Sequence, residues 1–583
     1  MSAGAALSSR AEDAFENHID NLINWFIVAR GVSTIDGNRT FPGTPIMAVS
    51  RRSFLRVAAL AGMATDLALP ISARAAQTLP RGGTLVIGAG PESTSGLTSA
   101  ITSAGTAQLV SGKIFDGLLT FDEQFNPKPQ LATHWEASSD GLSLTFHLRP
   151  GVRWHDGQPL TSKDVAYSVL EVWKKYHSRG RTTFANVIAV DTPDALTATL
   201  RLSKPAPYLL SALMSSVEAQ ILPQHLYTGR DVLSNPLNNA PIGNGPFKFV
   251  KWEQGNYVLL ERNPDYWDAP RPYVDKLLIR FIADRSGGAS ALETGEVHLT
   301  DNYGVALTDI VRLSRNPQIV VTDYPATYIT GTAAFEFNLD RPQFRDPRVR
   351  QAFAHAFDRN FIVKNIWLGY ADKVEAPIPK AFPAFFTTDV PTYPLDLAKA
   401  EALLEAAGLK RDSQGVRLTL TNDPAPTGPL APIAQHLRSN LQKIGVRLNI
   451  RSSDFGEFVN RVYTRRDFDT IIYSANAGPD PAIGTQRFYW SKNFKPGVAF
   501  SNAADYHNPE VDQLLESGQA EIDPAKRRAI YDRFQQQVQT DVARIPLISP
   551  HVVTLARREV LNFGGNQALY TNFANVALDR KPA

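Results

Sequence analysis

The sequence predicts a mixed α/β fold with more than one packed lobe. The chain has 583 residues, of which 43% are hydrophobic and 20% charged, as in ordered globular proteins. Segments with the alternating pattern of strands are interspersed with segments whose apolar residues follow the helical period. No fixed short repeat runs through the chain, so a solenoid or a propeller is not expected.

A strand and two turns are predicted in the first third of the chain. In residues 142–149 (LSLTFHLR) apolar and polar side chains alternate, which is typical of a half-buried strand. Pro150-Gly151 then predicts a turn into residues 152–154, so we expect a hairpin here. Asp156-Gly157 predicts a second turn, and a single histidine beside that aspartate is too incomplete a set for a metal site.

Capping residues predict where several helices begin. Thr161 with Asp164 three residues later has the pattern of a capping box, and Asp-Pro pairs precede helices at Asp346 and Asp523. Residues 397–407 form another helical segment, which ends at a glycine. We interpret the apolar residues at helical spacing as core contacts: Val165, Val169 and Trp173; Val349, Phe353, Ala356, Phe357 and Phe361; Ile530, Phe534, Val538 and Val542.

Charge and cysteine content narrow the function classes. The formal net charge is +3 and both signs are interspersed, which argues against nucleic acid as the main partner. The chain has no cysteine, so disulfides, thiolate metal sites and cysteine nucleophiles are excluded. The lipid-attachment cysteine of bacterial lipoproteins is missing as well, so we expect an exported form to be soluble and not lipid-anchored.

The sharpest local signal is an export signal. Residues 50–56 (SRRSFLR) are followed by a weakly apolar run over 57–69 and then by Ala73-Arg74-Ala75. A charged region, an apolar region and a small-residue cleavage site follow one another in this order in signal peptides. The arginine pair resembles that of a twin-arginine signal. We assign residues 47–75 to this signal and expect cleavage near Ala75. Residues 1–46 are either an over-extended start, with translation beginning at Met47, or a real extension. A chance arginine pair ahead of a buried helix is the simpler alternative.

Nine short segments carry a further signal, at residues 114–118, 129–136, 140–149, 151–157, 161–165, 243–249, 262–267, 337–338 and 346–352. In this order they resemble the motifs of extracytoplasmic solute-binding proteins of the peptide and nickel class, family 5, of ABC transporters. The resemblance covers essentially the whole mature chain.

The resemblance implies a bilobal periplasmic-binding-protein-like fold of the large three-domain type, with the ligand cleft between the lobes. By analogy, lobe I consists of residues 77–327 together with residues 545–583, where the chain returns to it. Lobe II consists of residues 328–544. Closure of the lobes would bury a polar ligand from water, and the closed form would be recognised by the membrane permease.

The segment 472–481 (IYSANAGPDP) bears most directly on the ligand. In relatives that bind free dipeptides, an aspartate three residues before the Asp-Pro pair binds the ligand's ammonium group. A tryptophan lies six residues before the same pair. Here these positions are Ala477 and Ser474. A buried ammonium group without a counter-charge is costly, so recognition of a free amino terminus is not expected unless another acid substitutes. Asp480 is interpreted as a helix cap before Pro481.

No catalytic motif is complete. The stretch that ends at Gly112-Lys113 lacks the spacing of a phosphate loop, and neither a Gly-x-Ser-x-Gly elbow nor a His-Glu-x-x-His pair occurs. We therefore expect no catalytic residue, no metal and no cofactor. The resemblance and residue types place the predicted ligand contacts at Ser93, Thr94, Tyr473, Ser474, Asn476, Ala477 and Trp490, with core packing as the alternative for Trp490.

The predicted function is the substrate-binding component of an ABC importer in the periplasm. Its ligand would be a peptide-like or other polar small solute, and its partners an inner-membrane permease with ATPase subunits and the twin-arginine export machinery. We expect a monomer. An exported enzyme with a cleft active site and a binding protein for an opine, a saccharide conjugate or a metal chelate remain alternatives, and the sequence does not separate transport from chemosensing.

Overall fold

The computed structural model describes residues 79–92, 96–564 and 568–579. The predicted signal peptide, the residues before it and the predicted contacts Ser93 and Thr94 lie outside this part. The described chain is a mixed α/β structure, as predicted, and its three largest sheets have seven, six and four strands.

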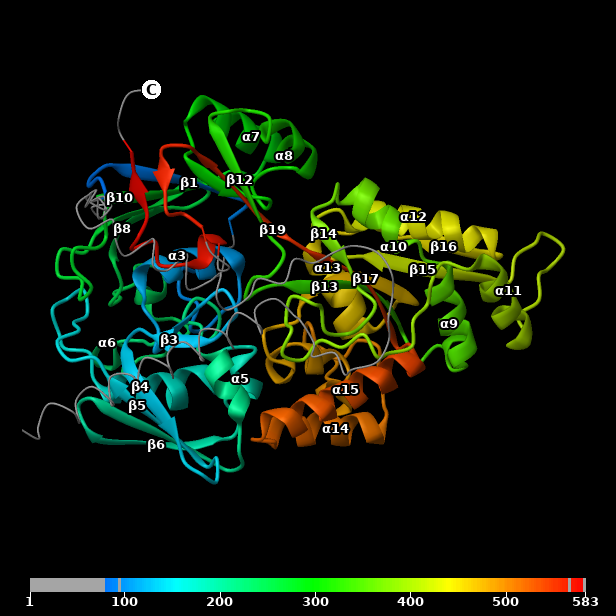
Figure 1. Ribbon diagram of the computed structural model, residues 1–583, viewed down its shortest axis with the longest axis horizontal. Coiled ribbons are helices and arrows are strands. Elements are labelled where there is room, and N and C mark those ends of the chain that lie inside the picture. The colour runs from blue at the N-terminus through cyan, green and yellow to red at the C-terminus, as the bar shows by residue number, and fades with distance from the viewer. Residues whose placement is uncertain (1–78, 93–95, 565–567, 580–583) are drawn as a thin grey trace, which may run out of the picture. The chain divides into compact units, whose positions relative to one another are not determined.

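Strands from both ends of the described chain form the seven-stranded sheet (Figure 1). β1 lies at its centre, parallel to β10 and β11, and the other pairings are antiparallel. Leu85 and Ile87 of β1 are fully buried, as expected for a central strand. In sheet order the strands are β12 (Ile319–Tyr324), β19 (Val552–Arg557), β11 (Leu299–Asp301), β1 (Thr84–Ala89), β10 (Lys276–Phe281), β9 (Tyr257–Arg262) and β8 (Phe247–Glu253).

The six-stranded sheet shares one apolar core with three helices. Phe335 in β13, Phe353 in α9 and Leu437 in α12 are fully buried in this core, and Leu404 of α11 packs with them. The strands are, in sheet order, β14 (Ala371–Lys373), β18 (Arg544–Pro550), β13 (Gly331–Phe337), β17 (Thr470–Asn476), β15 (Leu418–Pro424) and β16 (Val446–Ile450). The helices are α9 (Pro347–Ala356), α11 (Leu397–Ala406) and α12 (Leu430–Lys443).

The chain passes between these two sheets at residues 325–330 and again at His551. The predicted lobe boundary at 327/328 falls in the first passage. The second predicted boundary, at 545, falls inside β18, whereas the strands change sheet at His551. The ring of His551 lies 2.9 Å from a carboxylate oxygen of Asp323 in β12 and 3.7 Å from one of Asp372 in β14, so it contacts both sheets. The division into two lobes stays a prediction.

The four-stranded sheet is antiparallel and contains the predicted strand. Its order is β4 (Ala132–Ala137), β5 (Ser143–Leu148), β7 (Thr197–Leu202) and β6 (Val187–Asp194). The predicted capping box is confirmed: the Thr161 N–H donates to the carboxylate of Asp164 at 2.8 Å, and α4 (Ser162–Tyr167) follows. Val165, Val169 and Trp173 are fully buried, as predicted.

The predicted hairpin between β5 and residues 152–154 is wrong. β5 pairs instead with β4, the strand just before it, and with β7, which is distant in sequence, so both of its edges are already occupied. Residues 152–154 bond to residues 158–160, with Trp154 N–H donating to the Gln158 carbonyl at 2.8 Å. The turn between them is the predicted one, since Gly157 has φ +89° and the Gln158 N–H donates to Asp156.

The predicted helix starts at Asp346 and Asp523 are confirmed, because both carboxylates accept hydrogen bonds from the first turns of α9 and of α15 (Pro524–Asp541). The prediction that Phe361 continues the buried stripe of α9 is wrong. α9 ends at Ala356, and Asp358 caps a new turn, so the Phe361 side chain is 41% exposed and stacks on His436 instead. A competing cap therefore interrupted the helical period.

Candidate ligand-binding site

Four of the nine segments that carry the family resemblance contribute to a buried hydrogen-bond cluster around Asp116. Its carboxylate, which is fully buried, accepts four hydrogen bonds of 2.8 Å, from Gln130, Tyr266, Trp267 and Asn572. Its own N–H donates to Asn244, which lies shortly before β8. Burial raises the pKa of Asp116, and the donated hydrogen bonds oppose that rise. Because these four donors satisfy the carboxylate of Asp116, the cluster holds the fold together.

The segment that the sequence singled out as ligand-binding is β17 and the loop after it. β17 pairs along its length with β13, Ser474 lying opposite Ala333 and Asn476 opposite Gly331. Tyr473, Ser474 and Asn476 are half-buried. The amide oxygen of Asn476 accepts a 2.8 Å hydrogen bond from the Gly478 N–H, which holds the turn that ends the strand.

Ala477 is packed tightly at the start of this loop. Its N–H donates to the Thr330 carbonyl at 3.0 Å, and its carbonyl accepts from the Thr485 N–H at 3.1 Å. The side chain is 3% exposed and belongs, with Ala482 and Ile483, to the apolar core formed mainly by residues before 330. The loop after β17 therefore packs against the part of the chain that carries the seven-stranded and four-stranded sheets.

Asp480 caps the next turn, as predicted, and also pairs with a buried arginine. Its carboxylate accepts from the Ala482 N–H at 2.9 Å and makes two hydrogen bonds, of 2.6 and 2.8 Å, with the guanidinium of Arg527 in α15. Burial alone would lower the pKa of Arg527, but the contact with Asp480 outweighs it and raises that pKa. The charge of Asp480 is thus neutralised within the protein.

Aromatic side chains enclose Tyr473. Its ring stacks on Phe500, with centroids 5.3 Å apart and an interplanar angle of 17°, and lies 6.3 Å from Phe458. Burial raises the pKa of Tyr473 to about 12, against the opposing influence of Arg487, so the phenol is neutral at physiological pH. The residue can offer a ligand one hydroxyl group and an aromatic face.

Two arginines that the sequence reasoning missed lie beside this segment. Arg487 belongs to the short helix Thr485–Phe488 after β17, and its Nε is buried without a hydrogen-bond partner. Burial and the nearby charge of Arg179 lower its pKa to about 10. The Arg179 side chain is 9% exposed; its Nη2 donates to the Ile483 carbonyl at 3.3 Å and lies 3.5 Å from a carboxylate oxygen of Glu218. No sequence motif marks either arginine.

The remaining predicted contact, Trp490, lies farther along the same loop. Its indole N–H donates to Glu516 of α14 (Pro509–Ala520) at 3.0 Å, and the ring packs against the core shared by α14 and α15. This packing is the alternative that the sequence left open, and a ligand contact for Trp490 stays a prediction.

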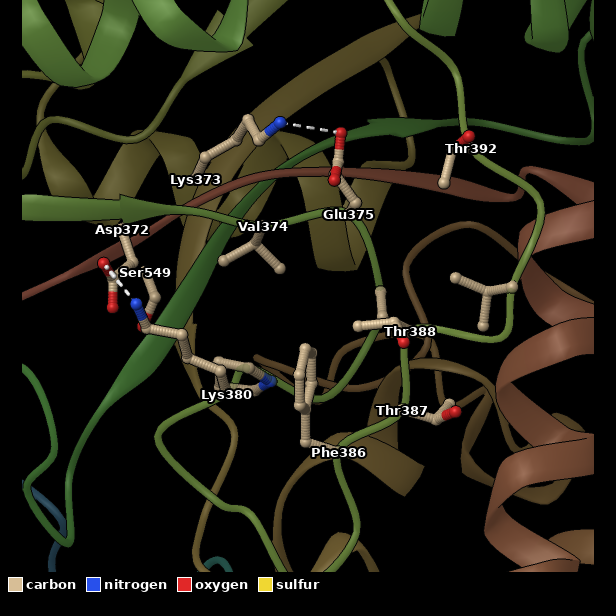
Figure 2. Close-up of a pocket in the computed structure, with 13 residues that line it drawn as sticks. Asp372, Lys373, Val374, Glu375, Lys380, Phe386, Thr387, Thr388, Thr392 and Ser549 are labelled. Carbon is tan, nitrogen blue, oxygen red and sulfur yellow. Dashed lines mark ion pairs between the residues drawn. The ribbon is translucent and has the colours of Figure 1, made fainter. Parts of the chain in front are cut away.

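Two further cavities do not include any of the predicted contacts. The pocket in Figure 2, of about 190 Å³, is lined by residues 372–392 and Ser549, and its charges are paired internally: Lys373 with Glu375 at 3.0 Å and Lys380 with Asp372 at 3.2 Å. The other, of about 490 Å³, borders the Asp116 cluster at Tyr266 and Trp267. Each charged side chain that lines the pocket in Figure 2 therefore has an ion-pair partner within the lining.

Within the described ranges 79–92, 96–564 and 568–579, no group of three or more His, Asp or Glu side chains is placed to hold a metal ion. The same ranges contain no helix that is both long and apolar enough to cross a membrane.

Comparison with known proteins defines the class. Residues 126–496 match the family of bacterial extracellular solute-binding proteins, family 5, middle region. A Brucella ovis protein named for peptide binding in an ABC transporter is 31% identical over 454 residues, covering 74% of this chain and 80% of its own.

Solved structures of two binding proteins share the fold. NikZ of Campylobacter jejuni, in complex with Ni(L-His), is 24% identical with a TM-score of 0.74 and covers 85% of this chain and 99% of its own. DppA of Helicobacter pylori, in complex with the peptide STSA, is 25% identical with a TM-score of 0.73 and covers 86% and 99%.

The chain is thus a bacterial extracellular solute-binding protein, in a class of binding proteins and not of enzymes. More particularly, it belongs to family 5 and has the role of a substrate-binding component of an ABC importer.

Proposed function

We propose that the protein is exported to the periplasm as a soluble monomer, binds a peptide-like or other polar small solute between its two lobes, and delivers it to an inner-membrane permease with ATPase subunits. The relatives named above support the ligand class, since two of them are named or solved with peptides. The sequence at residues 50–56, which resembles a twin-arginine signal, supports the proposed export route.

The observation that carries the proposal is the position of the segment after β17. Ile483 and Ala482 of this segment pack in the core formed mainly by residues before 330, while β17 itself belongs to the six-stranded sheet. Arg179, on the other side, donates to the Ile483 carbonyl. A segment held by both parts of the chain is where closure of two lobes would enclose a ligand.

Within this arrangement Tyr473, Ser474 and Asn476 are the ligand contacts we propose from β17. Ser93 and Thr94, which lie outside the described residues, are proposed as further contacts. Ala477 contributes shape and backbone and no charge. A closed, water-excluding site makes each hydrogen bond to a polar solute count for more than it would in water.

The test is ligand-dependent stability of the mature protein, residues 76–583, after unfolding and refolding to remove bound solutes. Free dipeptides, N-acetylated dipeptides and small sugar acids are added singly. A solute that binds only the folded state raises Tm, and the increase grows with the logarithm of the solute concentration. At 100 times Kd the solute adds about 2.7 kcal/mol to the free energy of unfolding. The solute must be recovered unchanged; chemical turnover would contradict a purely binding role.

A further inference from the structure

Buried charges at the candidate site do not balance. Arg179 lies 3.5 Å from Glu218, and Arg544 makes a 2.7 Å ion pair with Glu336. These pairs use both carboxylates. Arg487 makes no side-chain hydrogen bond and no ion pair with any residue of the described chain, so one guanidinium charge at this site has no counter-ion.

An unpaired guanidinium in such surroundings is unfavourable. Taking a charge out of water costs several kcal/mol unless an opposite charge or hydrogen bonds compensate. The guanidinium of Arg487 lies 5.4 Å from the ring centroid of Phe488. Burial and the charge of Arg179 lower the pKa of Arg487, and the charge of Glu218, which is paired with Arg179, opposes this only in part. Arg179 cannot relieve the imbalance because it carries the same charge.

Arg487 is also placed where a ligand would be bound. It follows Ile483, whose carbonyl accepts the hydrogen bond from Arg179, by four residues. Tyr473, a proposed ligand contact, interacts electrostatically with Arg487 and Arg179. Arg487 is half-buried as a residue although its Nε is fully buried, so part of its guanidinium still has accessible surface.

We propose that Arg487, assisted by Arg179, forms an acid subsite that binds a carboxylate of the ligand, so that the solute is a small organic acid without a free α-ammonium group. This rests on the proposed function. The guanidinium fork matches a carboxylate bidentately. Ala477 supplies no carboxylate for an ammonium group, and Arg487 supplies an excess cation; both point to a solute of net negative charge, such as an N-acylated amino acid or a sugar-acid conjugate.

The first arm of the test is the charge of the bound solute. Mature wild-type protein, purified from its own export route without unfolding, is analysed by native mass spectrometry and the released solute is identified. A bound carboxylic acid lacking a free α-amino group is expected. A neutral or cationic solute overturns the acid subsite and leaves the binding function standing. A protein that carries nothing and is not stabilised by any probe overturns the proposed function as well.

The second arm separates binding from folding. Arg487→Met is expected to weaken the identified acid roughly 10- to 100-fold, the equivalent of losing charged hydrogen bonds. The Tm of the ligand-free variant should stay the same or rise, because an uncompensated charge is removed. A structural arginine would behave oppositely, with a lowered ligand-free Tm, and that result would overturn the proposal.

Two further arginine variants serve as controls for Arg487→Met. Arg533→Gln removes an exposed arginine paired with Glu510 and should leave affinity unchanged. Arg487→Lys retains the charge without the fork and should bind less tightly than wild type but more tightly than Arg487→Met. If Arg487→Met does not fold, the methyl ester of the same acid is titrated into wild-type protein, where a loss of less than about threefold would contradict the subsite.

Discussion

The buried pair of Asp480 and Arg527 is expected to hold the candidate site in place, and its removal gives a prediction with a definite magnitude. Asp480 is 2% exposed and Arg527 6%, and two hydrogen bonds of 2.6 and 2.8 Å join them. Arg527→Met leaves a buried carboxylate without its cation. Breaking a buried pair in this way costs about 3–5 kcal/mol of unfolding free energy.

The assay is urea unfolding of ligand-free mature protein followed by tryptophan fluorescence, with Arg533→Gln as the matched control. The Arg533 side chain is 68% exposed and 3.1 Å from Glu510, so its loss should cost at most about 1 kcal/mol. Adding Asp480→Asn to Arg527→Met removes the stranded charge and should recover more than about 1 kcal/mol. If Arg527→Met costs no more than the control, the pair does not hold the segment and the reasoning fails.

Three other predictions concern separate parts of the chain. Gly484→Ala should destabilise the protein and weaken ligand binding, because a Cβ at this position would lie 1.7 Å from the Ala477 carbonyl oxygen. The control is Gly105→Ala, where a Cβ would have open space around it. Equal Tm values for the two variants would contradict this prediction. Burial raises the pKa of Asp301 from 3.8 to about 6, so the folded state binds the proton more tightly and the free energy of unfolding falls as the pH rises from 4 through 6. Asp301→Asn should flatten this pH dependence and stabilise the protein by up to about 3 kcal/mol at pH 7. An unchanged pH dependence of the unfolding free energy, measured by urea titration, would count against this prediction. Replacing Arg51 and Arg52 with lysine should leave the precursor in the cytoplasm in a fractionation assay, whereas processing near Ala75 at the wild-type rate would refute the export route.

Capping chemistry could be predicted from the sequence because it depends on residues that are neighbours in the chain. Thr161 with Asp164, Asp346 and Asp480 all accept the expected backbone hydrogen bonds. The same local logic failed at Phe361, where Asp358 provides a competing cap, and in the hairpin after β5, where β4 and β7 already occupy both edges of β5. Local patterns do not show which of two competing interactions wins.

The electrostatics of the candidate site could not be predicted, because its partners are far apart in sequence. Asp480 is recognisable as a cap, but its ion pair is with a residue 47 positions away. Arg487 has no motif, and its significance lies in the absence of a counter-charge among described neighbours from several segments. The missing carboxylate at Ala477 was visible in the sequence, whereas the excess cation that complements it required the fold.

The most direct test of the central claim, that this is a solute-binding protein, is the intact mass of the natively exported protein before and after denaturation. The account predicts a non-covalent 1:1 complex with one small solute, which is lost on denaturation and returns unchanged when added back. A protein that carries no solute and binds none, or one that converts the added solute into a product, would contradict it.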